Sequence, residues 1–179
     1  PKDVQNANLV FQGEGVLPIP GYRARLAEVR RNRLSTESCS AFEALLKASS
    51  RPLLYVGGGA INGNAAPAIR EFANAYGLPV TTTLMGIGAV DTTGDLSLHM
   101  LGMHGTAYAN YAVEDCDFLI TLGARFDDRV AGVPDKFAPR AKAVAHFDID
   151  PAEINKVKRV QWHHVGELAV AIEDLHAHL

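Results

Sequence analysis

The chain has 179 residues, of which 47% are hydrophobic, and its 17 basic and 20 acidic side chains leave a net charge of −3. The length suits one ordinary domain with a proper core, and the near-neutral balance argues against a nucleic-acid-binding protein, which would carry a basic surplus. No apolar run approaches the roughly 20 residues that a membrane-spanning helix needs, so we expect no membrane partner.

Residues 1–34 form the least regular part of the chain. Gly13 and Pro18 interrupt any long element, and the stretch Arg23–Arg33 is strongly basic and poorly amphipathic. We expect these residues to be a linker or arm that leads from a preceding domain over a surface. The first residue is Pro1 rather than methionine, which is why we expect a fragment or a processed product.

From residue 35 onward, predicted helices and strands alternate. A capping box of Ser40 and Glu43 predicts the start of a helix. The apolar run Leu53–Val56 predicts a buried strand, and the glycines at 57–59 predict a tight turn after it.

A second helix is predicted with Pro67 in its first turn and Gly77 at its end. The apolar face of this helix has helical spacing and comprises Ile69, Phe72, Ala73 and Tyr76. The strand Pro79–Thr83 follows, and together these elements make one right-handed parallel βαβ unit.

Residues 84–104 are rich in Gly and Met and have only patchy periodicity, which predicts a long connection without regular structure. A loop of that length inside a compact domain is usually functional. The elements predicted after it are a helix capped by Thr106, strands at 118–122 and 143–147, a short helix that begins at Pro151, and a helix at 167–179. This alternation predicts a doubly wound, Rossmann-like parallel α/β sheet with helices on both faces, formed by residues 35–179.

The most informative stretch is FLITLGARFDDRVAG, residues 118–132. A buried strand ends there, and Arg125, Asp127, Asp128 and Arg129 follow it within five positions. Ligands of open α/β sheets bind beyond the carboxyl ends of the strands, so we predict a ligand site at these charges. The alternative is a solvated turn whose charges pair with one another.

The glycine turn at residues 57–59 could bring backbone N–H groups to a phosphate. It does not match the dinucleotide-binding fingerprint, because Asn62 holds the place of the third glycine. The strand that should end in an acidic residue reads VTTT at 80–83 instead. Both departures argue against a nicotinamide-binding Rossmann site, and a tight turn alone would explain two of the three glycines.

Two carboxylates, Asp148 and Asp150, follow the predicted strand at 143–147. Carboxylates at this place could accept hydrogen bonds from ribose hydroxyls or an adenine amino group, which is the role of the missing acid. Asp150 could equally cap the helix that begins at Pro151, so both roles stay open for it. For Asp148 we predict the ligand contact.

Other candidate groups lack partners in the sequence. His104 lies between two glycines and could contact a ligand, but no catalytic partner is visible for it. His163 and His164 lack further residues at metal-ligand spacing and are predicted to lie on the surface. Cys39 and Cys116 have neither metal nor disulfide spacing, which predicts a reducing, intracellular setting. No nucleophile with a neighbouring general base is visible in the sequence. The chain therefore looks more like a cofactor-binding protein than a complete catalyst.

Four segments together resemble one family. They are LYVGGG at 54–59, TTLMGIG at 82–88, LSLHMLGMHGTAYANYAVEDCDFLITLGARFDDRVAG at 96–132 and HFDIDPAEI at 146–154. In these segments the chain is similar to the central domain of acetohydroxyacid synthase (acetolactate synthase) catalytic subunits. The resemblance covers residues 1–5 and 51–168, and its most specific part is the LGMHGT…ARFDDR block.

The resemblance implies the central FAD-binding domain of a thiamine-diphosphate enzyme of branched-chain amino-acid biosynthesis, a transferase that condenses pyruvate with pyruvate or 2-ketobutyrate. Thiamine diphosphate, Mg²⁺ and the catalytic glutamate would belong to flanking domains of the same polypeptide. No catalytic residue and no metal site are therefore expected in this chain, which alone would be inactive. The implied partners are those domains, further copies of the chain and a regulatory small subunit, in the bacterial cytoplasm or a plastid.

In this family FAD takes no net redox part in the main reaction. Carried over residue by residue, the FAD contacts would be Gly58, Thr83, Leu84, Leu101, Gly102, Met103, His104, Gly123, Ala124, Arg125, Phe126, Asp127, Asp148 and Ile149. Glu167 would be a further contact, although the family usually has Asp there. Lys2 and Arg129 match residues that line the access channel of the second 2-keto acid. The family also uses an arginine just upstream of Pro1 to contact FAD, and this chain lacks it.

Two other readings remain. One is a free-standing nucleotide-binding module of the same fold, as in transhydrogenase-type or sirtuin-like proteins. The other is the central domain of a different thiamine-diphosphate enzyme, such as glyoxylate carboligase or pyruvate oxidase. The ARFDDR block and the missing fingerprint acid favour acetolactate synthase over both.

Overall fold

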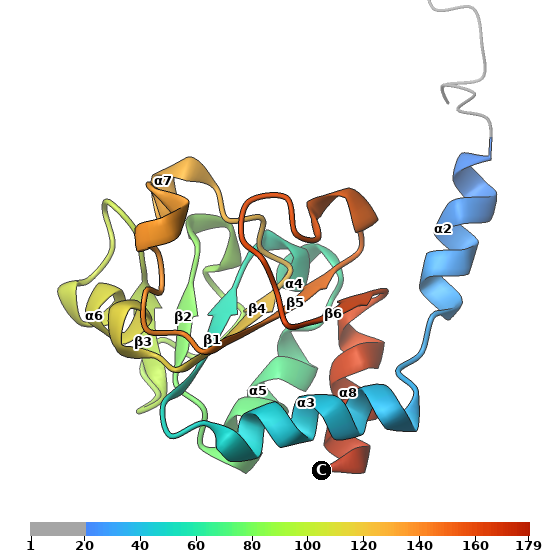
Figure 1. Ribbon diagram of the computed structural model, residues 1–179, viewed down its shortest axis with the longest axis horizontal. Coiled ribbons are helices and arrows are strands. Elements are labelled where there is room, and N and C mark those ends of the chain that lie inside the picture. Colours follow the sequence, from blue (N-terminus) through green and yellow to red (C-terminus); the bar gives the residue numbers. More distant parts are fainter. Residues whose placement is uncertain (1–20) are drawn as a thin grey trace, which may run out of the picture.

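The computed structural model describes residues 21–179, in which six parallel strands form one sheet in the order β3-β2-β1-β4-β5-β6 (Figure 1). The strands are β1 (Pro52–Val56), β2 (Val80–Thr82), β3 (Ser97–Met100), β4 (Phe118–Leu122), β5 (Ala143–Asp148) and β6 (Trp162–Val165). All five neighbouring pairs are parallel. The order reverses between β1 and β4, as in doubly wound nucleotide-binding sheets. The predicted Rossmann-like α/β fold is confirmed.

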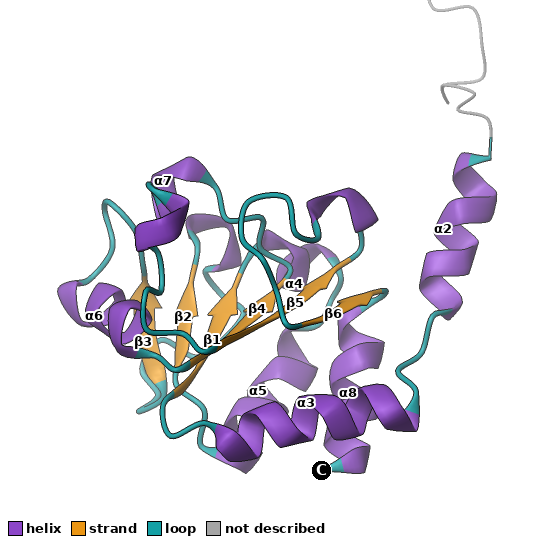
Figure 2. Ribbon diagram, viewed as in Figure 1, coloured by secondary structure: helices purple, strands orange, loops and turns teal. Residues whose placement is uncertain are grey.

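Helices pack against both faces of this sheet, although unequally (Figure 2). The helices are α2 (Tyr22–Arg31), α3 (Thr36–Ala48), α4 (Gly58–Asn62), α5 (Ala66–Tyr76), α6 (Ala107–Asp115), α7 (Asp128–Ala131) and α8 (Leu168–His178). Three short 3-10 turns complete the structure: η1 (Leu84–Gly86), η2 (Pro134–Lys136) and η3 (Pro151–Glu153). Helices α3, α4, α5 and α8 cover one face, whereas α6 and the segment after β4 cover the other.

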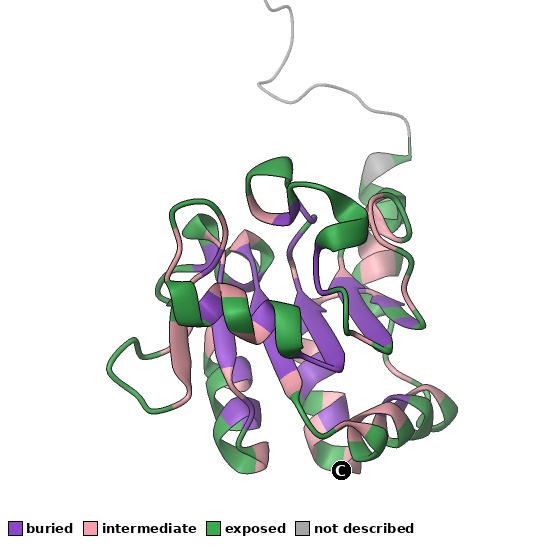
Figure 3. Cartoon of the chain, turned by 60° about the vertical axis from the view of Figure 1, so that its left-hand side comes forward, coloured by how far each residue is buried: buried purple, intermediate pink, exposed green. Residues whose placement is uncertain are grey.

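Side chains alternate between the two faces along each central strand, as the pleat requires. In β1, Leu54 and Val56 belong to the core under α3, α5 and α8. Leu53 and Tyr55 belong to the core on the α6 side. Because the two cores cover both of its faces, β4 is buried along its whole length (Figure 3). A central strand buried on both faces is why its sequence reads as an unbroken apolar run.

The predicted helix after residue 35 begins five residues earlier than expected. Ser35 is the N-cap of α3, and its side chain accepts a hydrogen bond from the backbone N–H of Ser38 at 3.2 Å. Ser40 therefore lies inside the helix, and the predicted capping box is wrong. Ser35, Ser38 and Ser40 offer equivalent capping chemistry, so the sequence alone does not single out Ser35.

Residues 22–31, predicted as part of an irregular arm, form helix α2. The helix is attached to the edge of the domain by the residues just after it. Asn32 donates its side-chain N–H to the carbonyl of Val165, and Arg33 forms a bidentate ion pair with Asp174 of α8. The first 20 residues of the predicted arm lie outside the described residues.

Strands β3 and β6 were not predicted. The connection expected at residues 84–104 contains β3, an edge strand whose register with β2 is irregular and in which His99 has a left-handed φ of 59°. Strand β6 is short and carries His163 and His164. Neither strand has the apolar run that marks a central strand, because each lies at an edge of the sheet.

Candidate cofactor-binding edge

Because all six strands are parallel, their carboxyl ends lie along one edge of the sheet (Figure 1). We call the segments that follow these ends the carboxyl edge: residues 57–59, 83–87, 101–105, 123–129, 148–150 and 166–167. Every described residue of the predicted cofactor set lies on this edge, immediately after a strand or at its last position. Arg129 lies there too, whereas Lys2 lies outside the described residues.

The glycine turn after β1 packs directly against the turn after β4. Gly57 donates its N–H to the carbonyl of Leu122 at 2.9 Å, and Gly59 donates to the carbonyl of Gly123 at 3.0 Å. A Cβ at Gly57 would lie 2.3 Å from the carbonyl oxygen of Gly123, and one at Gly58 would lie 2.9 Å from Cβ of Met85. Close packing is therefore sufficient reason for all three glycines: Gly57 and Gly59 lie against the backbone of Gly123, and Gly58 lies against the side chain of Met85.

The turn after β4 contains two residues with a left-handed backbone conformation. Gly123 has a φ of 60°, and Phe126, a bulky residue, has a φ of 55°. Such a conformation costs about 1–3 kcal/mol for a residue with a side chain, and packing must hold it. The Phe126 ring is 97% buried and lies against Tyr55, Phe137 and His146. Any ligand contact of Phe126 would therefore use its backbone.

The charges around Phe126 stay on the surface. Asp127 is the N-cap of α7, and its carboxylate accepts the backbone N–H of Arg129 at 3.0 Å. That hydrogen bond, a hydrogen bond with Asp128 and the nearby guanidinium groups lower the pKa of Asp127. Within residues 21–179 neither Arg125 nor Arg129 has an ion-pair partner. The charged turn is therefore solvated, as the alternative reading expects, and Asp127 interacts electrostatically with both guanidinium groups without forming a close ion pair.

The two carboxylates after β5 divide their roles. Asp150 accepts the backbone N–H of Ala152 at 2.9 Å and caps η3, which is the structural role left open for it. Asp148 accepts the backbone N–H of Asp150 at 2.9 Å, and its side chain is only 10% exposed. A carboxylate has about four lone-pair sites, so Asp148 retains acceptor capacity for a ligand at its exposed margin.

Large apolar side chains are exposed on the carboxyl edge. Leu84, Met85 and Met103 are 68%, 70% and 78% exposed, and Ile87 and Ile149 are about half exposed. Single exposed apolar residues are ordinary, but several on one edge indicate a surface that another apolar group covers. Met85 and Ile87 were absent from the predicted set, although their positions in the LMGIG segment were the available signal.

The other predicted residues differ in what they offer a ligand. Leu101 and Ala124 are buried, so they can offer only backbone groups, whereas His104 is exposed. Glu167 already forms an ion pair with Arg30 at 3.2 Å, which competes with a ligand contact. His164, predicted to lie on the surface, is buried over Gly166, and desolvation lowers its pKa.

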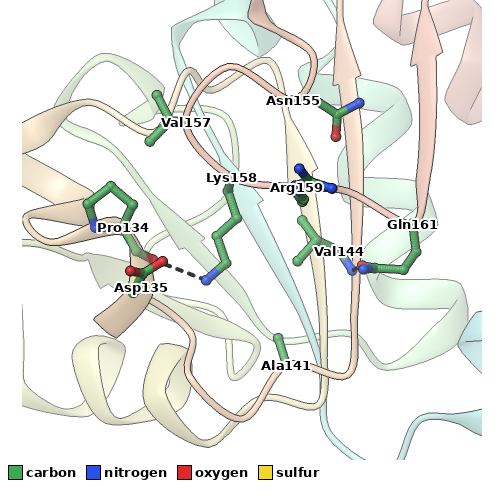
Figure 4. Close-up of a pocket in the computed structure, with 9 residues that line it drawn as sticks. All are labelled: Pro134, Asp135, Ala141, Val144, Asn155, Val157, Lys158, Arg159 and Gln161. Atoms are coloured by element: carbon green, nitrogen blue, oxygen red, sulfur yellow. Dashed lines mark hydrogen bonds between the residues drawn. The ribbon is translucent and has the colours of Figure 1, made fainter.

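A separate hollow of about 510 Å³ lies away from the carboxyl edge, beside the start of β5 (Figure 4). Its lining includes Asp135, Lys158 and Gln161. Lys158 donates to the carbonyl of Pro134 at 3.3 Å and also to that of Phe137, and Gln161 accepts the backbone N–H of Val144. Lys158 and Gln161 are occupied in joining loops, so size alone does not make this hollow the ligand site.

Within the described part of the chain, no three His, Cys, Asp or Glu side chains come together as metal ligands. No helix among residues 21–179 has the length and apolar character needed to cross a membrane.

Comparison with known proteins identifies the family. Residues 40–175 match the family model described as thiamine pyrophosphate enzyme, central domain. The acetolactate synthase large subunit of Parasynechococcus marenigrum is 58% identical over 128 residues, which are 72% of this chain and 21% of that protein. The large subunit of Pyropia yezoensis is 45% identical over 177 residues (98% of this chain, 29% of that protein). Acetolactate synthase 1, chloroplastic, of Zea mays is 46% identical over 178 residues (99% and 27%).

The chain thus spans between a fifth and a third of the length of these relatives. Its parallel sheet, its strand order and the family match over most of its length agree with one another. The chain belongs to the central-domain family of thiamine pyrophosphate enzymes.

Proposed function

We propose that this chain is the central, FAD-binding domain of an acetolactate synthase large subunit. The whole enzyme would use thiamine diphosphate and Mg²⁺, held by flanking domains, to condense pyruvate with a second 2-keto acid. The names of the relatives at 42–58% identity support this assignment over the central domain of another thiamine enzyme. They also argue against a free-standing nucleotide-binding module.

The observation that carries the FAD proposal is the composition of the carboxyl edge. Apolar side chains at 84, 85 and 103 lie at the β2–β3 end, and Asp148 lies at the β5 end. Arg125, which has no ion-pair partner among the described residues, lies between them after β4. This order suits a flavin ring, a pyrophosphate and an adenosine in succession. Four strand spacings separate β3 from β5, or roughly 19 Å, a span for an extended dinucleotide rather than a mononucleotide.

The donor set of the edge fits the chemical groups of FAD. The guanidinium of Arg125 would pair with the pyrophosphate, and the remaining lone pairs of Asp148 would accept hydroxyl or amino hydrogens from the adenosine half. Backbone groups of buried residues such as Leu101 and Ala124 would supply further hydrogen bonds. Bound FAD would supply a planar ring whose apolar dimethylbenzene part could cover the exposed methionines.

Two residues are assigned to the channel of the second keto acid. Arg129 is exposed on α7, outside the buried strand end, and we assign its guanidinium to the keto-acid carboxylate. Lys2 would line the same channel. The proposed partners are the flanking domains, further copies of the chain and a regulatory small subunit. The proposed compartment is a plastid in a eukaryote, as the name of the maize relative says for that protein, or the cytoplasm in a bacterium.

Titration of FAD fluorescence with the purified chain tests the cofactor assignment. We expect saturable but weak binding, because the arginine that the family uses just before the residue matching Pro1 lies outside the 179 residues tested. The loss of one charge-assisted contact costs about 1.5–3 kcal/mol, or roughly ten- to a hundredfold in affinity. No saturable change up to millimolar FAD would contradict the proposal. Tight, stoichiometric flavin in the purified 179-residue polypeptide would contradict the importance given to that arginine.

A further inference from the structure

A buried histidine lies between two segments of the carboxyl edge. His146, on β5, is fully buried, and its Nε2 lies 2.9 Å from the carbonyl oxygen of Ala124. A carbonyl oxygen can only accept a hydrogen bond, so Nε2 carries the proton and donates it. The side chain therefore ties β5 to the turn after β4, directly before Arg125.

The same nitrogen faces the segment after β5. Nε2 of His146 lies 3.6 Å from Oδ2 of Asp148, which is too long for a hydrogen bond but close enough for attraction between the N–H dipole and the carboxylate. The other oxygen of Asp148 accepts the backbone N–H of Asp150. The backbone thus holds one oxygen of the Asp148 carboxylate, and the imidazole N–H lies beside the other.

The imidazole also supports the left-handed residue of the turn after β4. The ring of Phe126 packs edge-on against His146, with centroids 5.2 Å apart and an interplanar angle of 77°. This packing helps hold the strained φ of Phe126, which places Arg125 and Asp127 on the outside. One buried ring therefore contacts both segments that carry the proposed polar contacts to FAD.

The surroundings of the ring show that it is a costly choice for packing alone. Nδ1 of His146 is buried without a hydrogen-bond partner among the described residues. Thr121, its neighbour in register on β4, and Tyr55, next along on β1, also bury an unpaired hydroxyl. An apolar side chain of the same shape would avoid the desolvation penalty at Nδ1. The benefit of histidine here is its Nε2 donor.

We propose that His146 is a positioning residue of the cofactor site, whose Nε2–H holds the turn after β4 and the Asp148 carboxylate in the arrangement that receives a dinucleotide. This inference rests on the proposed function for its ligand. The role of His146 in holding residues 123–127 and 148–150 does not depend on the proposed function.

Three variants of His146 and one control separate the effect of the Nε2–H donor from the effect of side-chain volume. His146→Gln keeps an N–H donor near the Nε2 position, His146→Asn is polar but too short to reach Ala124, and His146→Leu is apolar. Phe147→Leu alters the next residue of β5, which belongs to the opposite core, and matches the others for a general loss of packing. Hydrogen exchange of residues 123–127 and 148–150 without cofactor is the first measurement, and FAD titration is the second.

We expect His146→Asn and His146→Leu to raise exchange in both segments at least fivefold over wild type and to weaken FAD binding about tenfold, whereas His146→Gln should keep both close to wild type. Phe147→Leu should lower stability and leave FAD affinity within about twofold. The positioning role would be overturned if His146→Gln and His146→Asn had the same exchange rates and FAD affinity. Unchanged exchange in His146→Asn and His146→Leu would overturn it too. If the His146→Leu variant does not fold, the comparison of His146→Gln with His146→Asn decides whether the donor matters. Failure of the wild-type chain to bind FAD would instead reject the proposed function, and the exchange result would still judge the role of His146.

Discussion

Gly59 donates its backbone N–H to the carbonyl of Gly123 at 3.0 Å, and a Cβ added to Gly59 would lie 2.7 Å from Cα of Gly123. This contact joins the turn after β1 to the turn after β4, the two strands between which the strand order reverses. Because both turns belong to the carboxyl edge, the contact sets the spacing of the backbone that would face the cofactor.

We predict that Gly59→Ala lowers the free energy of unfolding by about 1–3 kcal/mol, the usual scale for overpacking. The added methyl group would meet backbone atoms, which cannot rotate away. Gly94→Ala is the matched control, because its Cβ would meet only the carbonyl of Asp91 at an ordinary 3.4 Å. Urea unfolding of both variants measures the difference. A Gly59→Ala chain as stable as the control would show that the two turns separate easily.

Asp117 anchors the opposite end of the sheet. Its carboxylate accepts the backbone N–H of Ser50 and of Arg51, each at 2.9 Å, and the hydroxyl of Ser49. Burial raises the pKa of Asp117, but these hydrogen bonds and the charge of Arg51 outweigh burial and lower the pKa to about 2. The contact joins the turn before β1 to the start of β4.

A lowered pKa makes this contribution to stability depend on pH. The carboxylate stabilises the fold fully above its unfolded pKa of about 4, and the stabilisation is lost as the pH falls from about 4 to about 2. We predict that Asp117→Asn lowers stability at pH 7 by roughly 2 kcal/mol and flattens the acid limb of a stability profile. Asp115→Asn, at an exposed ion pair with Arg140, should change little. Indistinguishable acid limbs for Asp117→Asn and wild type would contradict the assignment.

The central part of the fold could be predicted because burial on both faces leaves an unambiguous sequence. Phe118–Leu122 is buried at every position, and a run of that kind has few other interpretations. The helix from Ala66 to Tyr76 was equally clear, since Pro67 and Gly77 mark its ends. The edge strand Trp162–Val165 was missed because its two histidines hide the alternation of burial that an edge strand shows.

The candidate site was predictable as a set of chain positions but not as a set of side-chain roles. Asp150 and Asp148 look alike in sequence, yet one caps η3 and the other faces His146. Phe126 is buried through a left-handed backbone conformation, which the sequence ARFDD does not predict. The pairing of Glu167 with Arg30 joins residues far apart in the chain, and only the fold brings them together.

We predict that the 179-residue chain makes no acetolactate from pyruvate, with or without thiamine diphosphate, Mg²⁺ and FAD. Its described residues contain no cluster of metal ligands, and we assign the thiamine diphosphate site to flanking domains. An acetolactate assay beside an intact acetolactate synthase measures this directly. Product above a protein-free blank, lost when Arg129→Ala replaces the wild type, would refute the prediction.

The last prediction separates the two arginines of the turn after β4. Arg125 directly follows the buried strand end and lies beside the anchored carbonyl of Ala124. Arg129 lies four residues further on, in α7, where only its backbone is engaged: its N–H is held by Asp127, and its carbonyl accepts the N–H of Met103. Truncation of either side chain therefore leaves the turn itself intact.

We expect Arg125→Ala to weaken FAD binding about tenfold, the scale of one lost charge-assisted hydrogen bond. Arg129→Ala should leave FAD affinity within about twofold. In a full-length acetolactate synthase, the change matching Arg129→Ala should instead raise the KM for the second keto acid, because a guanidinium partner of its carboxylate is gone. Flavin fluorescence titration, with circular dichroism to verify folding, decides the first comparison. Equal losses of FAD affinity at the two positions would mean that both guanidinium groups serve the cofactor, and that the keto-acid channel lies elsewhere.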